Sequence, residues 1–485
     1  MFEYLKRLGR TGAAYATSSV VAKLFAVALL PLYTHYLSRA DYGAAEVLLA
    51  GVVMTSIFVR LGIIEALLRF YYRFDAAADR ERAVRTSFTW LLITTTVGAA
   101  IAVPFAGLLS ELLLAERNAT LVLVAIGGLW IFTNYELLLA LFRLDERARA
   151  YLITSSINVL LTIGLTVWLV VGLHEGAEGL LLGNFGASAV VYFGLLLFQR
   201  KRLGIELAPK LLQPMLRFGV PTMPAEISIF SLNFVDRFLL VRFSGLGQAG
   251  LYSIAVKFSQ VVIVVVRAFQ LAWPPLAYSI REDSEARRAY AMIVTYYLFV
   301  CTWIVVGLAL LARWLLRLLV ADQFFAAWKA IPFVATGAML YGLYLVLIVI
   351  IGRVGRTEFN FPVVGSAMLV NIGLNLVLIP PFGIVGAGLS LVGSYLCMLV
   401  ALYFIGRRFF VVPFQWLRLL RIAVVGAGLV ALGELLLPAS DTSGLISRAA
   451  LLGAYPVLLF LSGFFSHAEL NWFKGFVGRS RSSGQ

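Results

Sequence analysis

The sequence predicts an all-α polytopic membrane protein, and three observations lead to this fold class. Of the 485 residues, 61% are hydrophobic and 13% are charged, whereas a soluble domain has about half apolar and a quarter charged residues. The mean hydropathy of +0.92 is correspondingly high. About fourteen apolar runs also reach the roughly 20 residues that a helix needs to cross a bilayer.

The predicted membrane helices follow one another with short connections, which leave no room for a soluble domain. The first run is too long for a cleavable signal sequence, and no small-residue cleavage site follows it. In chain order, the predicted spans are residues 11–37, 42–68, 86–109, 119–142, 150–172, 177–198, 214–241, 249–277, 289–311, 330–351, 359–379, 383–405, 418–437 and 446–465.

Positive charge is distributed in a way that predicts the orientation of the chain. The net charge is +15, but most of the 40 Lys and Arg residues lie in short clusters in alternate loops. Such a bias indicates cytoplasmic loops, so we expect both termini to be cytoplasmic. Because the basic residues form no single basic surface, we do not expect a nucleic-acid partner.

The two halves of the chain match each other at a nearly constant offset. A shift of 207 residues places Gly43 on Gly250 and Arg60 on Arg267. This predicts a six-helix lobe over residues 1–205, its repeat over 206–410, and two further helices with a cytoplasmic tail over 411–485. Since six is an even number, the lobes are expected to share one orientation and a pseudo-two-fold axis along the membrane normal.

Motifs for catalysis, ATP hydrolysis or cofactor binding are missing from the sequence. No GxxxxGK[ST] loop occurs, and the three histidines have no partner ligands at metal spacing. Cys301 and Cys397 each lie inside an apolar run, where packing is the expected role. We therefore predict neither an enzyme, a metal site nor a cofactor.

One predicted membrane helix, 249–277, carries a polar stripe. Ser253, Lys257, Gln260 and Arg267 recur at spacings of four, three and seven, which places them along one helical face. A charged side chain inside the membrane is costly unless it faces protein or water. We therefore interpret Lys257, Gln260 and Arg267 as candidate substrate-binding residues that line a cavity.

The first lobe supplies two further candidate cations. Arg60 occupies the place equivalent to Arg267, and Lys23 lies near the middle of the first predicted helix. Snorkelling to the headgroups and an ion pair with a neighbouring helix are the alternative roles for Arg60 and Lys23. For an anionic substrate, the three residues would form a cationic cavity.

Four charged residues in the predicted spans are candidates for energy coupling or for structural ion pairs. Glu226 and Glu136 are the deepest carboxylates, whereas Asp236 and Arg237 lie nearer the outer face. Each carboxylate either neutralises a basic neighbour or takes up a proton or cation during transport. The sequence leaves both roles open.

Five segments resemble one family of transporters. They read LPLYTHYLSRADYG at 30–43, RFYY at 69–72, VPTMPAE at 220–226, VDRFLL at 235–240 and AGLYSIAVK at 249–257. These residues resemble the polysaccharide-transporter branch of the multidrug/oligosaccharidyl-lipid/polysaccharide exporter superfamily, whose Wzx-type members are repeat-unit flippases. The likeness covers nearly the whole chain, and it implies two six-helix lobes around a central cavity.

The resemblance also implies a substrate and a location. The expected substrate is an oligosaccharide on polyprenyl pyrophosphate, turned from the cytoplasmic to the outer leaflet of a bacterial or archaeal plasma membrane. Lys23, Arg60 and Arg267 match positions where related flippases carry cavity cations. Besides membrane lipids, a polysaccharide polymerase and glycosyltransferases are the implied partners.

Two other functions stay open at this point. A cation-coupled multidrug antiporter of the same superfamily is expected to have a carboxylate in its first lobe, but the first predicted helix carries Lys23 and no acidic residue. An integral-membrane polymerase or glycosyltransferase is the more distant alternative. It would ordinarily require a sizeable extramembrane loop, for which this chain has no room.

Overall fold

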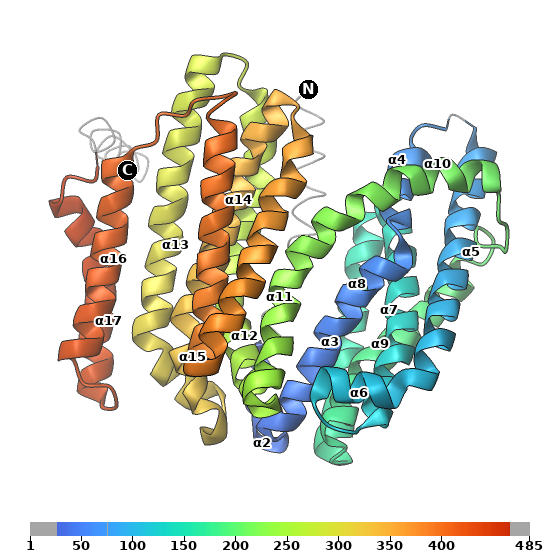
Figure 1. Ribbon diagram of the computed structural model, residues 1–485, viewed down its shortest axis with the longest axis horizontal. Helices are drawn as coiled ribbons and strands as arrows, with labels where there is room; N and C mark the ends of the chain where they lie inside the picture. Colours follow the sequence, from blue (N-terminus) through green and yellow to red (C-terminus); the bar gives the residue numbers. More distant parts are fainter. Residues whose placement is uncertain (1–26, 75, 466–485) are drawn as a thin grey trace, which may run out of the picture.

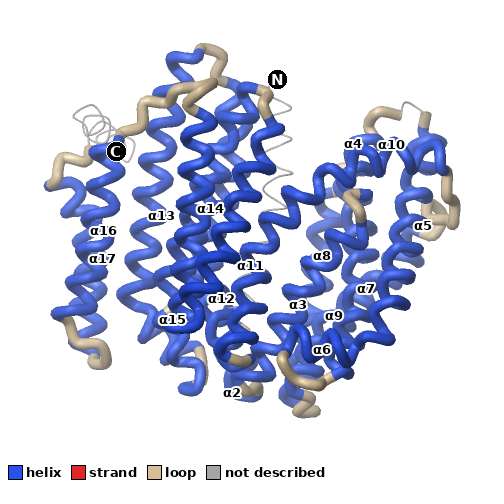
Figure 2. The backbone as a smooth tube through the Cα atoms, viewed as in Figure 1, coloured by secondary structure: helices blue, strands red, loops and turns tan. Residues whose placement is uncertain are grey.

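The computed structural model describes residues 27–74 and 76–465. Within these ranges every regular element is a helix and no strand occurs (Figure 2). The predicted all-α polytopic fold class is confirmed.

Most of the described chain lies in long helices that run roughly side by side (Figure 1). In chain order, the α-helices are α2 (Leu30–Tyr36), α3 (Arg39–Arg60), α4 (Ile63–Tyr71), α5 (Ala77–Ala102), α6 (Ala106–Leu114), α7 (Ala119–Leu144), α8 (Ala148–Val167), α9 (Gly176–Gln199), α10 (Pro209–Gly219), α11 (Met223–Ser244), α12 (Leu246–Ser279), α13 (Asp283–Leu319), α14 (Ile331–Val354), α15 (Asn360–Gly406), α16 (Trp416–Leu436) and α17 (Thr442–Leu461). Short helical turns connect some of them: η1 (Val103–Phe105), η2 (Trp168–Gly172), η3 (Val220–Thr222), η4 (Asp322–Lys329) and η5 (Thr357–Phe359).

In the described part of the chain, 11 helical segments are long and apolar enough to cross a membrane. The difference from about fourteen predicted spans has three sources. The first predicted span lies mostly outside the described residues. Helix α11 is long enough, but it carries several charged side chains and is not among the 11. The spans predicted at 359–379 and 383–405 are both present as helices, but they share the label α15 and count as one segment, because they meet at a sharp kink at Gly383, just after Pro380 and Pro381.

The span predicted at 42–68 is divided into α3 and α4. Helix α3 begins at a capping box, in which the Ser38 side chain accepts from the Asp41 amide and Asp41 accepts from the Ser38 amide. It ends because Leu61 and Gly62 have φ angles of 51° and 67°, a left-handed conformation that no helix continues. The sequence pattern missed this break, since apolar residues continue across it.

The helices form two lobes with α11 between them (Figure 1). Helices α3 to α10 form one side of the molecule and α12 to α17 the other. Helix α3 packs extensively on both α11 and α12, and the largest apolar core runs through this contact. The tail helices α16 and α17 pack on α13 around a separate small core that includes Leu310 and Tyr455.

The contact between α3 and α12 is reciprocal. A Cβ added to Gly43 would lie 2.1 Å from the carbonyl oxygen of Leu246, and one added to Gly250 would lie 2.2 Å from that of Arg39. Gly43 and Gly250 are 207 residues apart, and so are Arg39 and Leu246, which is the offset found in the sequence. Reciprocal contacts of equivalent residues are what two copies around a two-fold axis produce. The lobe boundaries at 205 and 410 stay predictions.

Candidate functional site

One guanidinium and three carboxylates meet where the two lobes join. The Arg60 guanidinium pairs with Glu136 of α7 at 3.2 Å, with Glu65 of α4 at 3.8 Å and with Glu226 of α11. Arg60 is only 8% exposed. We call these four residues the Arg60 cluster. The cluster connects the end of α3 to the start of α11, which belongs to the second predicted lobe.

Charge does not balance within the Arg60 cluster. Three carboxylates surround one guanidinium, and one oxygen of Glu65 is buried without a hydrogen-bond partner. Moving charged groups out of water costs free energy, and their mutual attraction offsets this cost only when the ion pairs and hydrogen bonds are well aligned. The cluster therefore has a surplus of acidic groups, which a proton, a cation or a cationic side chain would neutralise.

Close backbone contact positions the Arg60 cluster. Gly62 lies against Gly219 at the end of α10, so closely that a Cβ on Gly62 would lie 2.3 Å from the Gly219 carbonyl oxygen. Because Gly62 and Gly219 lie within a few residues of Arg60 and Glu226, this contact brings the two charged side chains together. A larger residue at either glycine would move α10 away from α3.

A second network lies nearer the predicted outer end of α3. Buried Glu46 pairs with Lys257 of α12 at 2.9 Å and with Arg237 of α11 at 3.7 Å. Arg237 also donates to the Ser253 hydroxyl at 3.0 Å. We call these four residues the Glu46 network. Like the Arg60 cluster, it joins the lobes, but here its cations outnumber its acidic group.

Asp236 is the most deeply buried of the candidate carboxylates, with 1% of its surface exposed. It accepts hydrogen bonds from the Tyr252 hydroxyl at 2.8 Å and from the Asn375 amide at 2.6 Å. The same amide donates to Asn371 at 3.0 Å. These donors are neutral, so Asp236 is held by hydrogen bonds rather than by a direct ion pair of the kind that holds Glu46.

Arg267 has a different environment from Arg60, although the two are equivalent in the repeat. Its side chain is exposed, and it donates to Gln270 one turn further along α12 at 2.6 Å. No carboxylate of the described residues lies within ion-pair distance of it. Gln260, on the same helix, is half-buried. Neither Arg267 nor Gln260 belongs to the two charge networks.

The sequence-predicted candidates thus separate into groups. Glu136 and Glu226 join Arg60, whereas Lys257 and Arg237 join Glu46; Lys23 lies outside the described residues. Sequence reasoning missed Glu65, because its spacing of five from Arg60 is not a helical one and the break at Gly62 was not foreseen. It also missed Asn371 and Asn375, although two amides four residues apart in an apolar run are a detectable signal.

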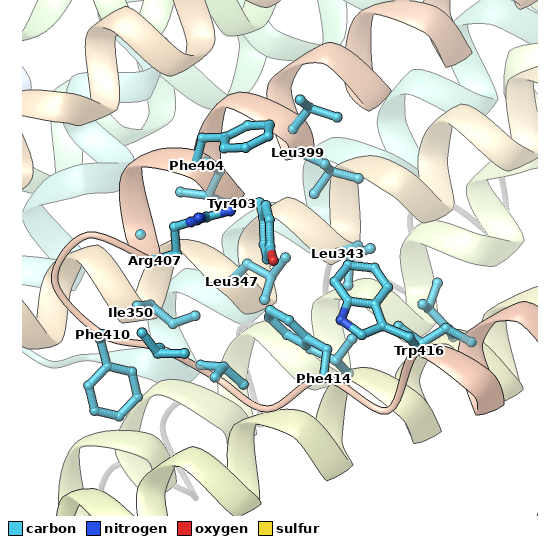
Figure 3. A pocket seen from close by; sticks show the side chains of 18 of the residues that line it. Leu343, Leu347, Ile350, Leu399, Tyr403, Phe404, Arg407, Phe410, Phe414 and Trp416 are labelled. Carbon is cyan, nitrogen blue, oxygen red and sulfur yellow. The ribbon is translucent and has the colours of Figure 1, made fainter.

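Two hollows of opposite character lie in the described part of the molecule. One, of about 240 Å³, lies among α2, α3, α8 and α9 and reaches Lys257 of α12; amides, hydroxyls and the Glu46 network line much of it. The other, of about 780 Å³, lies among α13, α14, α15 and α16 and is lined mainly by aliphatic and aromatic side chains. Figure 3 shows Arg407 beside Tyr403 and Phe404 in this second hollow.

The apolar hollow suits a hydrocarbon chain rather than a polar head group. Its polar atoms come mainly from Tyr403, Arg407 and Trp416, residue types that are common at the membrane interface. In the described ranges, no group of three or more His, Cys, Asp or Glu residues is placed to hold a metal ion.

Residues 34–329 match the sequence model of a family described as polysaccharide biosynthesis protein. An uncharacterized membrane protein of Methanocaldococcus jannaschii is 21% identical over 396 residues, which are 76% of this chain and 77% of that protein. Two kinds of solved structure are similar in fold. Lipid II flippase MurJ, in an inward closed conformation, has a TM-score of 0.75 at 13% identity and covers 94% of this chain and 99% of its own. An inward-facing multidrug resistance MATE family transporter of the MOP superfamily has a TM-score of 0.66 at 14% identity, and the match covers 80% of this chain and 93% of that one.

Proposed function

The chain belongs to the polysaccharide biosynthesis protein family and has a transporter fold, and from this premise we propose that it is a flippase. Its substrate is an oligosaccharide on polyprenyl pyrophosphate, which it moves from the cytoplasmic to the outer leaflet. A pyrophosphate with a hydroxyl-rich glycan does not cross hydrocarbon unaided, because each unpaired polar group costs several kcal/mol. Alternating access of the two lobes carries the head group while the isoprenoid tail stays in lipid.

The exposed guanidinium of Arg267 is the observation that carries this proposal. Arg267 lies 12 residues, or about 18 Å, before the end of α12 at Ser279. An arginine inside a membrane helix faces a cavity or a partner, and Arg267 has no carboxylate partner among the described residues. A pyrophosphate is the complementary anion, since it accepts two parallel hydrogen bonds from a guanidinium.

Arg60 acts differently in this proposal. Its guanidinium is already engaged by three carboxylates, so pyrophosphate binds it only by displacing them. That exchange would loosen the contact between α3 and α11 and so link substrate binding to movement of the lobes. Glu136 and Glu226, released from Arg60, then take up a proton or cation, and Asp236 is a further candidate for such coupling.

We infer that the protein lies in the plasma membrane with both termini in the cytoplasm, as the loop charges favour. Glycosyltransferases would supply the lipid-linked glycan, and a polymerase would consume it after translocation. Lys23, Lys257 and Gln260 are proposed as further cavity residues.

The test is export of surface polysaccharide by a strain that lacks the gene and carries a plasmid copy. We expect Arg267→Ala to abolish export at a normal membrane level of the protein, with accumulation of the lipid-linked oligosaccharide, because the pyrophosphate loses its partner. Lys23→Ala and Arg60→Ala should also abolish export. Arg200→Ala, at the exposed end of α9, is the control. Normal export by all three cavity variants would exclude the pyrophosphate-binding role.

A second candidate function is a cation-coupled multidrug antiporter. The fold likeness to the MATE transporter and the acidic surplus of the Arg60 cluster favour it. The same strain distinguishes the two functions. Loss of drug resistance with intact surface polysaccharide would support the antiporter, and loss of polysaccharide with intact resistance would support the flippase.

A further inference from the structure

The smaller of the two hollows lies among α2, α3, α8 and α9, on the side of the first lobe, and uncharged polar side chains line it together with aliphatic ones such as Leu49 and Ile163. Asn158, Thr162 and Thr166 of α8 contribute to it, and Asn184 of α9 lies beside them. The three α8 residues follow one another at spacings of four, so they share one helical face. Lys257 of α12, from the second lobe, also lines it.

Hydrogen bonds hold the amide side of this hollow in place. The Asn158 amide donates to the Ser188 hydroxyl at 3.3 Å, and that hydroxyl donates to the backbone carbonyl of Asn184 at 3.1 Å. These bonds connect α8 to α9, so the two asparagines line the hollow from adjacent helices. Tyr33 and Tyr42, both buried, add aromatic faces to the wall.

The charges in this wall cancel. Of the described residues that line the hollow, Glu46 and Lys257 are charged, and they are paired with each other at 2.9 Å. Among the described residues a phosphate therefore finds no free cation there, unlike at Arg267. A hydrocarbon chain is equally unsuitable, because it would leave amides and hydroxyls without hydrogen bonds in the membrane interior.

A neutral polyhydroxyl compound fits this chemistry. Each sugar hydroxyl both donates and accepts, and Asn and Thr side chains do the same. The volume of about 240 Å³ lies below the roughly 300–1,000 Å³ of pockets for drug-sized ligands, so one ring is the appropriate size. The larger hollow around Arg407 has the opposite lining and suits a lipid chain (Figure 3).

We propose that this hollow is a saccharide-binding subsite, which holds one neutral sugar ring of the lipid-linked oligosaccharide and so determines glycan specificity. The inference rests on the proposed flippase function. Lys257 and Arg267 are ten residues, or about 15 Å, apart along α12. This separation is longer than one sugar ring. The bound sugar is therefore not the one joined to the pyrophosphate but a later one in the chain.

The test compares two probes on the full-length protein in lipid nanodiscs. One probe is polyprenyl pyrophosphate without sugar, and the other is the lipid-linked oligosaccharide extracted from the source organism. The variant Asn158→Leu/Thr162→Val/Asn184→Leu removes the polar wall at similar volume. We expect roughly 100-fold weaker binding of the oligosaccharide probe, since each of the three lost hydrogen-bonding side chains weakens binding several-fold. Binding of the bare pyrophosphate should not change.

Two further variants serve as controls for this binding experiment. Thr336→Val removes a hydroxyl from α14 outside the hollow, and both probes should bind it as they bind the wild type. If the triple variant does not fold, Thr162→Val alone should weaken only the oligosaccharide probe, by several-fold. Equal weakening of both probes, or no weakening of either, would overturn the subsite. If the wild-type protein binds neither probe, the flippase function itself fails and the subsite with it.

Discussion

At the scale of single residues, the two arginines that the repeat makes equivalent have opposite environments. Arg60 is buried among three carboxylates, and Arg267 is exposed without one. The sequence predicted both as cavity cations because it shows residue type and depth. It does not show which carboxylates arrive from other helices, since Glu136 and Glu226 lie 76 and 166 residues from Arg60. The equivalent positions of the two arginines in the repeat were therefore predictable, whereas the carboxylates that pair with Arg60 were not.

This difference predicts different effects on stability. Arg60→Ala leaves three carboxylates without their cation, and removal of one partner from a buried ion pair costs about 3–5 kcal/mol. We expect a clear fall in the melting temperature of the purified protein. Arg60→Ala/Glu226→Gln should recover part of the loss, because one negative charge is removed with the positive one.

Arg267→Ala is the matched control, because its side chain is exposed and its loss leaves no buried charge. It should melt like the wild-type protein while still failing to export polysaccharide. If Arg60→Ala also melts like the wild type, the Arg60 cluster does not stabilise the fold as described.

At the scale of elements, the sequence predicted where the helices lie, but it predicted only some of the places where they are interrupted. The kink that divides α15 into two helices lies at Gly383, just after two prolines, and the sequence pattern had already placed a boundary there. The break between α3 and α4 has a single glycine and no proline, and apolar residues run through it. It exists because Gly62 must approach the Gly219 backbone. Such a tertiary requirement is invisible to periodicity.

Gly62→Ala is expected to disrupt the junction of α3, α4 and α10. Gly62 has a φ of 67°, where an alanine costs roughly 1–2 kcal/mol, and the added methyl group would lie 2.3 Å from the Gly219 carbonyl oxygen. We expect α10 to move away and the ion pair between Arg60 and Glu226 to break. Faster amide hydrogen exchange in α10 would report the change.

Gly107→Ala provides the comparison for this substitution. Gly107 lies in α6, and an added Cβ would meet nothing within 4 Å. Alanine is favoured over glycine in a helix by roughly 0.5–1 kcal/mol, so this variant should be as stable as the wild type or slightly more stable. Unchanged exchange of α10 in Gly62→Ala would show that the glycine contact does not hold the junction.

At the scale of the whole molecule, the two lobes meet through structures of different kinds at different depths. Near the predicted outer end of α3, backbone contacts between Gly43 and Gly250 lie beside the Glu46 network. Toward the other end of α3, the Arg60 cluster and Gly62 hold α11 and α10. The proposed alternating access requires at least the outer contacts to open, because the substrate would leave on that side. The α3–α12 contact is therefore expected to separate in each transport cycle.

A disulfide across this contact should stop transport reversibly. The Cβ atom of Arg39 lies 3.6 Å from a Cβ added to Gly247 of α12, within the roughly 3.5–4.5 Å of natural disulfides. In a chain with Cys301→Ala and Cys397→Ala, which removes both native cysteines, we expect Arg39→Cys/Gly247→Cys to cross-link on oxidation. Surface polysaccharide should then fall to the level of the strain without the gene.

The reduced protein and the two single-cysteine variants are the controls for this loss of export. Neither single variant can form the bridge, so both should export polysaccharide under oxidising conditions. Reduction of the double variant should restore export, because the lobes are then free to separate. Export by a fully cross-linked double variant would show that α3 and α12 stay together through the cycle. The opening would then have to lie elsewhere, and the proposal of alternating access about this contact would be wrong.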